Sequence, residues 1–131
     1  DARIQILNLA IETVRVGRAL GHKVVPPMGN FSLEEMEEAV GPKGHPEVIS
    51  VLTGSKPKLP GRPSMAQDII KERPTEIEYL NGFVSKRGKE IGIATPYSDA
   101  VTEVIKGIES GEFNIGIKNI LKVSEIVEAY K

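Results

Sequence analysis

The chain has 131 residues, of which 40% are hydrophobic and 27% charged, and its 17 basic and 18 acidic side chains leave a net charge near −1. This composition is typical of an ordinary globular protein with one hydrophobic core. The balanced charge argues against nucleic acid or an anionic membrane as a partner. The lack of cysteine excludes disulfides, thiolate nucleophiles and zinc–sulfur sites, and it fits a cytoplasmic location.

The N-terminal segment predicts a long helix with a wide apolar face. Apolar side chains recur at helical spacing along a first stripe, formed by Ile4, Leu7, Ile11 and Val14. A second stripe is predicted beside it, formed by Ile6, Leu9, Thr13, Val16 and Leu20. A face of this width is usually packed on two sides. Gly21 is placed to end the helix, because glycine readily adopts the left-handed conformation found at helix C-termini.

Two short helices are expected next. Ser32 and Glu35 form a capping-box pattern, in which each side chain accepts a hydrogen bond from the other residue's backbone amide, and they begin a helix that ends near Gly41. A further helix is expected at residues 46–52. Residues 53–63 contain too many prolines and glycines for regular structure, so they predict an ordered loop or a flap.

Two more capping-box patterns lie close together in the middle of the chain. Ser64 and Gln67 begin a short helix that ends before Pro74, and Thr75 and Glu78 begin a longer one. The longer helix is expected to turn four apolar side chains to one face, those of Ile77, Leu80, Val84 and Ile91.

The rest of the chain completes an all-helical pattern. Gly82 and Gly88 lie inside the longer helix, where glycine costs about 1 kcal/mol relative to alanine, so they predict close packing or a ligand contact. Pro96 begins the next helix from its favoured first position. The inner stripe of that helix is formed by Val101, Val104 and Ile108. A last helix is expected at residues 119–130. No segment alternates long enough to predict a strand, so we expect an all-α bundle of six or seven helices that forms a single domain over residues 1–131.

Two helix starts in the middle of the chain are candidate ligand-binding positions. Those at Ser64 and Thr75 present free amide groups and the positive end of the helix dipole, which favour an anion. Glu76 lies in the first turn of the second helix, and because the capping box does not use its side chain, the carboxylate can contact a ligand. A structural role is nevertheless the commoner one for both residue types, a cap for Ser64 and a dipole partner for Glu76. His22 and His45 lack metal-ligand spacing, so no metal site is predicted.

The same region resembles a known enzyme family. Residues 62–68, Arg-Pro-Ser-Met-Ala-Gln-Asp, are followed by residues 73–82, Arg-Pro-Thr-Glu-Ile-Glu-Tyr-Leu-Asn-Gly. Together they resemble the C-terminal signature of the ketopantoate reductase (2-dehydropantoate 2-reductase) family, in which the positions of Ser64 and Glu76 have the same separation. Residues 92–96, Gly-Ile-Ala-Thr-Pro, are similar to the Gly-Ile-x-x-Pro helix junction of that family.

The resemblance implies an NADP-dependent oxidoreductase that transfers a hydride from NADPH to the keto carbon of ketopantoate, a step of pantothenate and coenzyme A biosynthesis. It implies a helical C-terminal domain like that of 6-phosphogluconate-dehydrogenase-like enzymes, which works with an N-terminal Rossmann domain and a small 2-ketoacid substrate. By the same resemblance, Ser64 binds the substrate carboxylate. Glu76 has a supporting catalytic and cofactor-binding role where the substrate meets the nicotinamide ribose. A homodimer is a further expectation.

Three departures from the family pattern bear on function. No Gly-x-Gly-x-x-Gly motif follows a predicted strand, so the cofactor-binding domain is expected to be absent from this chain, which then reads as a truncated, inactive C-terminal half. The catalytic lysine of the family is expected upstream. Ser98 stands two positions after Pro96, where the family often has asparagine. That change favours an alternative, a dehydrogenase of the same fold for a different 2-hydroxy acid. The incomplete active site favours another, a non-catalytic helical oligomerisation module.

Overall fold

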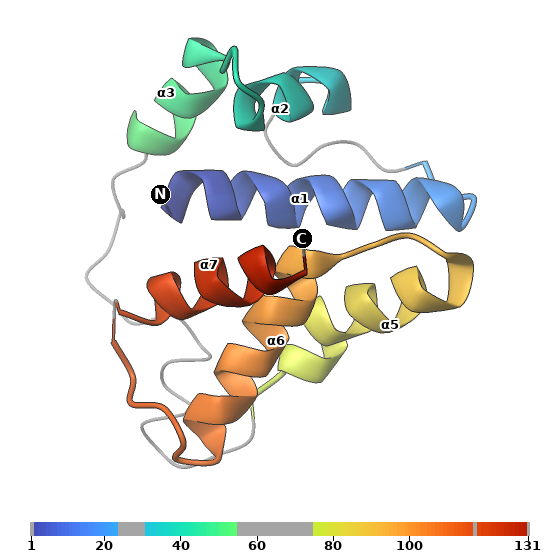
Figure 1. Ribbon diagram of the computed structural model, residues 1–131. Coiled ribbons are helices and arrows are strands. Elements are labelled where there is room, and N and C mark those ends of the chain that lie inside the picture. The colour runs from blue at the N-terminus through green and yellow to red at the C-terminus, as the bar shows by residue number, and fades with distance from the viewer. Residues whose placement is uncertain (1, 24–30, 55–74, 117, 131) are drawn as a thin grey trace. The chain divides into compact units, whose positions relative to one another are not determined.

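The computed structural model describes residues 2–23, 31–54, 75–116 and 118–130. Within these ranges it contains six α-helices, one short 3₁₀ helix and no strand (Figure 1), which confirms the predicted all-α class. No helix in the described part of the chain combines the length and the apolar character that crossing a membrane requires. The chain divides into two compact units, Asp1–Lys58 and Leu59–Lys131, called here the N-terminal and C-terminal units.

Three helices form the N-terminal unit, namely α1 (Ala2–Ala19), α2 (Leu33–Val40) and α3 (Pro46–Gly54). Two glycines end helices at the predicted positions. Gly21 follows α1 with a φ of +89°, a conformation that glycine adopts without steric cost. Gly41 is the C-cap of α2, and its backbone N–H donates to the carbonyl of Glu38.

The predicted capping box of α2 is confirmed, whereas the end of α3 was predicted too early. The backbone N–H of Glu35 donates to the Ser32 hydroxyl at 3.1 Å, and the N–H of Ser32 donates back to the Glu35 carboxylate at 3.3 Å. Thr53 and Gly54 continue α3 and do not belong to a loop. The rest of the predicted loop lies outside the described residues, as does the predicted Ser64 helix.

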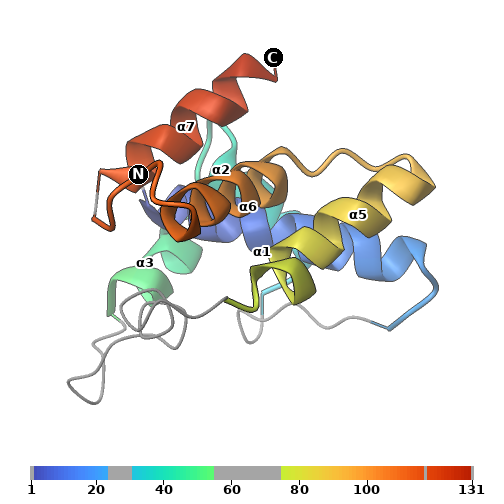
Figure 2. The same cartoon turned by 90° about the horizontal axis from the view of Figure 1, so that it is seen from below.

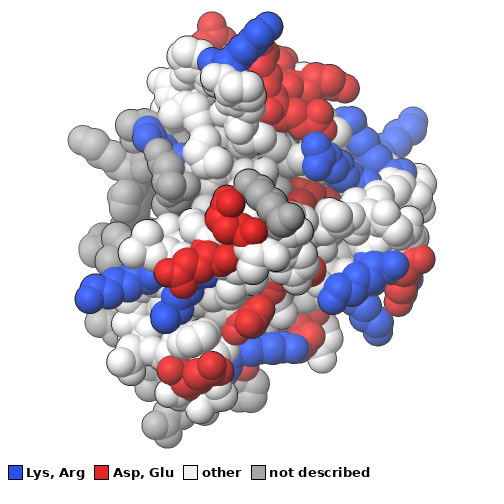
Figure 3. Space-filling model, viewed as in Figure 1, with Lys and Arg blue, Asp and Glu red and all other residues white. Residues whose placement is uncertain are grey.

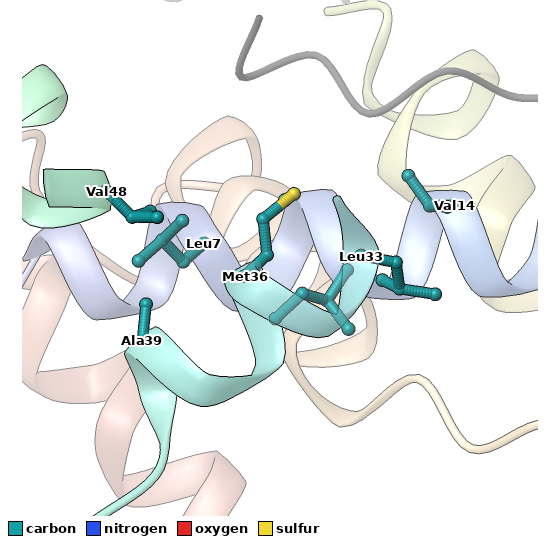
Figure 4. Packing of buried hydrophobic residues seen from close by; sticks show 7 residues of the cluster. Leu7, Val14, Leu33, Met36, Ala39 and Val48 are labelled. Atoms are coloured by element: carbon teal, nitrogen blue, oxygen red, sulfur yellow. The ribbon is translucent and has the colours of Figure 1, made fainter. Parts of the chain in front are cut away.

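The core of the N-terminal unit confirms the first apolar stripe of α1. Side chains from all three helices are buried together, those of Leu7, Ile11, Val14, Leu33, Met36, Ala39 and Val48. Figure 4 shows Leu7 and Val48 meeting, with Met36 of α2 beside them. Burying such side chains is worth roughly 1.5–3 kcal/mol each, so this cluster holds the three helices together.

The second predicted stripe of α1 is correct only in part. Val16 is buried, but Ile6 and Thr13 are exposed. The second buried band instead contains Gln5 and Glu12, which share a helical face with Val16. The predicted stripe therefore lies on the wrong part of the helix surface. The face that is buried carries two polar residues, so apolar spacing alone could not identify it.

The C-terminal unit contains η1 (Ile77–Tyr79), α5 (Asn81–Ile91), α6 (Pro96–Glu109) and α7 (Asn119–Ala129). Figures 1 and 2 show α6 lying between α5 and α7, and it packs against both. Pro96 occupies the first turn of α6 as predicted. The core of this unit joins α6 to α7 through Ala100, Val104, Val123 and Val127.

Close packing accounts for both glycines inside α5. A Cβ atom added at Gly88 would lie only 2.8 Å from the backbone oxygen of Ile93 and 2.8 Å from Cγ2 of Thr95. At Gly82 the added atom would lie 3.0 Å from the backbone oxygen of Ile77. The sequence left close packing and a ligand contact as possible reasons for these glycines, and the structure supports close packing. The glycine at 88 lets the chain after α5 fold back against the helix.

The structure corrects the helix predicted to begin at Thr75. A 3₁₀ turn, η1, forms first, and α5 begins only after Leu80, whose backbone angles are φ −109° and ψ −102°. The Thr75 hydroxyl donates to Glu109, and it accepts a hydrogen bond from the N–H of Ile77 and not from that of Glu78, so the capping box does not form. In the predicted box the N–H of Thr75 would donate to the Glu78 carboxylate, but that N–H donates to Glu109 and the Glu78 carboxylate pairs with Lys106, so both partners of the box are engaged by α6.

The common apolar face predicted for this helix is also wrong. Ile77 is buried, but Leu80 is 48% exposed and Ile91 is 36% exposed. The break at Leu80 interrupts the helical rotation, so side chains before and after it no longer line up.

Candidate functional site

The segment from Thr75 to Glu78 is fixed to α6 at its first residue. The backbone N–H of Thr75 donates to Oε1 of Glu109 at 3.0 Å, and the Thr75 hydroxyl donates to the same oxygen. Glu109 is the last residue of α6. Two donors of one residue therefore converge on one carboxylate oxygen that belongs to a distant part of the sequence.

The same segment is fixed again on its C-terminal side. The side chain of Ile77 is almost fully buried, and η1 packs against both α5 and α6. The Glu78 carboxylate forms an ion pair with the ammonium group of Lys106, also on α6. Hydrophobic burial and an ion pair thus hold the two residues that follow Glu76.

Glu76 itself lies between these anchored neighbours with its side chain exposed. Its backbone carbonyl accepts a hydrogen bond from the N–H of Tyr79 at 2.9 Å, which closes the 3₁₀ turn. The carboxylate has no hydrogen bond or ion pair to any other described residue. The structure therefore presents a carboxylate on a fixed backbone, an arrangement suited to accepting a hydrogen bond from a ligand. Ser64, the other predicted site residue, lies outside the described residues.

A groove of about 440 Å³ lies beside this segment in the C-terminal unit. Most of its lining side chains are polar or charged, and they come from η1, α5, α6 and the end of α7. Lys86, Lys89 and Lys106 face it together with Glu78, Asp99 and Glu103. Figure 3 shows acidic and basic side chains interspersed on this part of the surface, whereas acidic ones gather over α2. The groove therefore carries balanced charge, which suits a polar ligand better than a polyanion.

Asp99 lines the groove and accepts hydrogen bonds from three hydroxyl groups, a role that the sequence patterns did not predict. Its Oδ1 accepts hydrogen bonds from the hydroxyls of Ser85 and Thr95, the latter at 3.1 Å. Its Oδ2 accepts from the Tyr130 hydroxyl at 3.1 Å. These donors come from α5, from the residue that precedes α6 and from the C-terminal end of α7. Asp99 in the first turn of a helix was a visible signal, but its partners at positions 85 and 130 are remote in sequence.

The contact with Asp99 changes the acidity of Tyr130. Burial raises the pKa of the phenol above its ordinary value, and the charge of Asp99, the hydrogen bond to it and the charge of Glu103 raise it further. All these effects disfavour the phenolate, so the hydroxyl keeps its proton and remains a donor to Asp99.

His45 has a local structural environment in the N-terminal unit. Its ring meets the Phe31 ring edge to face, with centroids 5.8 Å apart. Its Nδ1 accepts a long hydrogen bond of 3.4 Å from the N–H of Val48, and its Nε2 lies 3.4 Å from the Glu35 carboxylate. Among the described residues no group of three or more potential metal ligands lies close together.

Comparison with known proteins assigns the chain to a family. The family profile described as "Ketopantoate reductase PanE/ApbA C terminal" matches residues 1–109, most of the chain. The chain belongs to this family. The predicted resemblance is thereby confirmed, and the matched region contains Ser64, Glu76 and every element up to the end of α6. Helix α7 lies beyond the matched region.

Curated relatives of the chain are 2-dehydropantoate 2-reductases. The protein from Lactococcus lactis is 52% identical over 48 residues, which cover 36% of this chain and 15% of that protein. The protein from Vibrio cholerae is 46% identical over 46 residues, 35% of this chain and 16% of the relative. The protein from Archaeoglobus fulgidus is 38% identical over 50 residues, 38% and 17% respectively. The match thus spans about a sixth of the length of these relatives. No solved structure matches the chain with significant similarity.

Proposed function

We propose that this chain is the substrate-side, C-terminal domain of an NADP-dependent 2-ketoacid reductase that converts ketopantoate to pantoate. Membership of the ketopantoate reductase C-terminal family supports the proposal, and so do relatives that are named 2-dehydropantoate 2-reductases. When bound, NADPH supplies the hydride. The protein supplies orientation and electrostatics around the reacting carbonyl group.

The observation that supports the proposal most strongly is that Glu76 has an exposed carboxylate on a fixed backbone. A carboxylate only accepts hydrogen bonds, so its natural partner is a hydroxyl of the ligand. Its backbone is fixed on both sides, while the carboxylate stays exposed and without a polar partner among the described residues. These features fit a hydroxyl of the nicotinamide ribose or of the product. We assign Glu76 a supporting catalytic and cofactor-contacting role.

Ser64 completes the proposed site on the substrate side. Its assignment rests on the family motif alone, in which the corresponding serine binds the substrate carboxylate. A hydroxyl at a helix N-terminus is suited to an anion, because both the hydroxyl and the free backbone amides donate hydrogen bonds.

We propose that this chain works together with an N-terminal Rossmann domain and with the catalytic lysine of the family. No Gly-x-Gly-x-x-Gly fingerprint occurs in the 131 residues, so the proposed NADP site depends on that domain. We expect the purified chain to transfer no hydride from NADPH to ketopantoate. Oxidation of NADPH by the chain alone, followed by its absorbance, would contradict this expectation.

The decisive experiment compares Glu76→Gln with the wild type in the intact reductase that carries this domain. NADPH oxidation with ketopantoate should be measured for both, and we expect a loss of kcat/KM of roughly 100-fold or more, in the range seen for single transition-state contacts. Glu90→Gln is the matched control, because Glu90 is also an exposed carboxylate of the C-terminal unit but pairs with Arg87 at 2.7 Å. Equal activity of Glu76→Gln and the control would remove Glu76 from the site.

The substrate assignment needs a separate measurement. Ser98, whose departure from the family pattern favoured another ketoacid, is fully buried in α6. A buried side chain offers no direct contact to a ligand, so this reason for a different substrate is weakened. Turnover of ketopantoate should therefore exceed that of other 2-ketoacids. A higher kcat/KM with another ketoacid would keep the reductase proposal and change its substrate, and inactivity on the whole panel would refute it.

A further inference from the structure

We propose that Glu109 is a positioning residue, which fixes the turn that carries Glu76 and so sets where the Glu76 carboxylate meets its ligand. The inference rests on the proposed function of Glu76. It concerns a residue that lies 34 positions from Thr75 and contacts it through two hydrogen bonds.

The first argument is the location of the anchors. Glu109 binds Thr75, the residue directly before Glu76, and Lys106 binds Glu78, which follows two positions later. Lys106 and Glu109 are one turn apart on α6, so they lie on the same face of that helix. One helix face therefore holds the segment at both ends, and Glu76 is the exposed residue between the two anchors. We call this pair of contacts the α6 clasp.

The second argument is the space made for the clasp by Gly82. An added Cβ at position 82 would lie 3.1 Å from Oε2 of Glu78, as well as close to the backbone of Ile77. A side chain there would press on the backbone oxygen of Ile77 at 3.0 Å and make the Glu78 carboxylate, which pairs with Lys106, shift. Gly82 of the motif thus leaves room for the backbone of η1 and for the carboxylate that forms one half of the clasp.

The third argument is the unfavourable position of Glu109 on its own helix. The C-terminal end of a helix carries a partial negative charge, which destabilises a carboxylate placed in the last turn. Helix stability therefore does not explain a glutamate at the end of α6. The two donors of Thr75 compensate for this position, since hydrogen bonds to a charged acceptor are among the strong ones.

The consequence for catalysis is that removing the clasp should misplace Glu76 without removing it. Displacements near 1 Å can cost about 100-fold in rate, so we expect Glu109→Ala to lower kcat/KM by roughly tenfold to 100-fold. Both hydrogen bonds from Thr75 end on a single oxygen. Glu109→Gln keeps such an oxygen, so it should restore most of the activity lost in Glu109→Ala.

The test is a double-mutant cycle in the intact reductase, with NADPH oxidation as the assay. Glu109→Ala is measured in the wild-type background and in the Glu76→Gln background. If Glu109 acts through Glu76, the loss should appear in the first background and largely disappear in the second. Glu90→Ala is the control, because it removes an exposed, ion-paired carboxylate from α5 that does not touch the segment. An equal loss in both backgrounds, or no loss in either, would overturn the inference.

A second measurement tests, independently of activity, whether the clasp holds the turn in place. Hydrogen exchange of the Thr75 and Tyr79 amides, which donate to Glu109 and to Glu76, should accelerate in Glu109→Ala but not in the Glu90→Ala control. Thr75→Val, which loses only the hydroxyl, should show a smaller effect and replaces Glu109→Ala if that variant does not fold. Should the wild type reduce no 2-ketoacid, the proposed function fails while the exchange rates still test the clasp. Unchanged exchange at both amides would refute it.

Discussion

The packing of α5 against the chain that follows it makes a quantitative prediction for Gly88→Ala. The added methyl group would meet the backbone oxygen of Ile93 and Cγ2 of Thr95, both at 2.8 Å, whereas unstrained carbon contacts lie at about 3.5–4.0 Å. The oxygen cannot move alone, because the N–H of Ile93 also donates to the carbonyl of Gly88 at 2.8 Å. The steric conflict therefore has to be relieved by shifting backbone.

The size of the effect follows from two opposing contributions. Overpacking of this kind costs about 1–3 kcal/mol, and the contact with backbone on one side points to the upper end. Alanine offsets about 1 kcal/mol through its better helix propensity. We expect the free energy of unfolding to fall by about 2 kcal/mol, which corresponds to a decrease in Tm of roughly 6 to 10 °C for a chain of this size.

Thermal and urea unfolding followed by circular dichroism at 222 nm measure this change. Lys89→Ala is the neighbouring control, because that residue is exposed and surface substitutions usually change stability by about 0.5 kcal/mol or less. A Gly88→Ala variant as stable as the wild type, or more stable, would refute the packing argument. The gain in helix propensity would then have outweighed the steric conflict expected from contacts of 2.8 Å.

Two further predictions concern the Asp99 cluster. Asp99→Asn keeps one acceptor oxygen for three hydroxyl donors, so it should lower the free energy of unfolding by about 1–3 kcal/mol, measured by urea denaturation at pH 7. The raised pKa of Tyr130 means that the folded state holds its proton more tightly than the unfolded state, whose phenol titrates near 10.0. The stabilisation that Tyr130 contributes to the folded state is therefore complete below pH 10.0, and it is lost as the pH rises through the higher pKa of the folded state. Stability should therefore fall above pH 10.0 more steeply in the wild type than in Tyr130→Phe, and parallel curves would contradict the assignment.

Local signals were sufficient wherever the deciding partner was close in sequence. The Ser32 and Glu35 cap, the end of α1 at Gly21 and the start of α6 at Pro96 all follow the predicted positions. Each depends on a hydrogen bond or a backbone preference within one helical turn. The C-terminal family signature is equally local, which is why the sequence alone indicates the family.

Local signals failed where a distant group competed for the same atoms. The Thr75 pattern has the spacing of a capping box, but the carboxylate of Glu109 accepts hydrogen bonds from both the hydroxyl and the backbone N–H of Thr75. Likewise, the second stripe of α1 was assigned to apolar residues, whereas Gln5 and Glu12 are buried there. Burial of a polar group depends on partners that periodicity does not reveal.

The sequence by itself determined the all-α class and the family to which the protein belongs. Apolar periodicity and short motifs express such properties directly, because they arise between residues a few positions apart. Only the tertiary structure decided what holds Glu76 in place and what forms the groove beside it. The clasp from α6 and the hydrogen bonds of Ser85 and Tyr130 to Asp99 join residues 14 to 34 positions apart. Such pairs come into contact only when the helices pack, since hydrophobic burial, and not the polar groups themselves, brings the helices together.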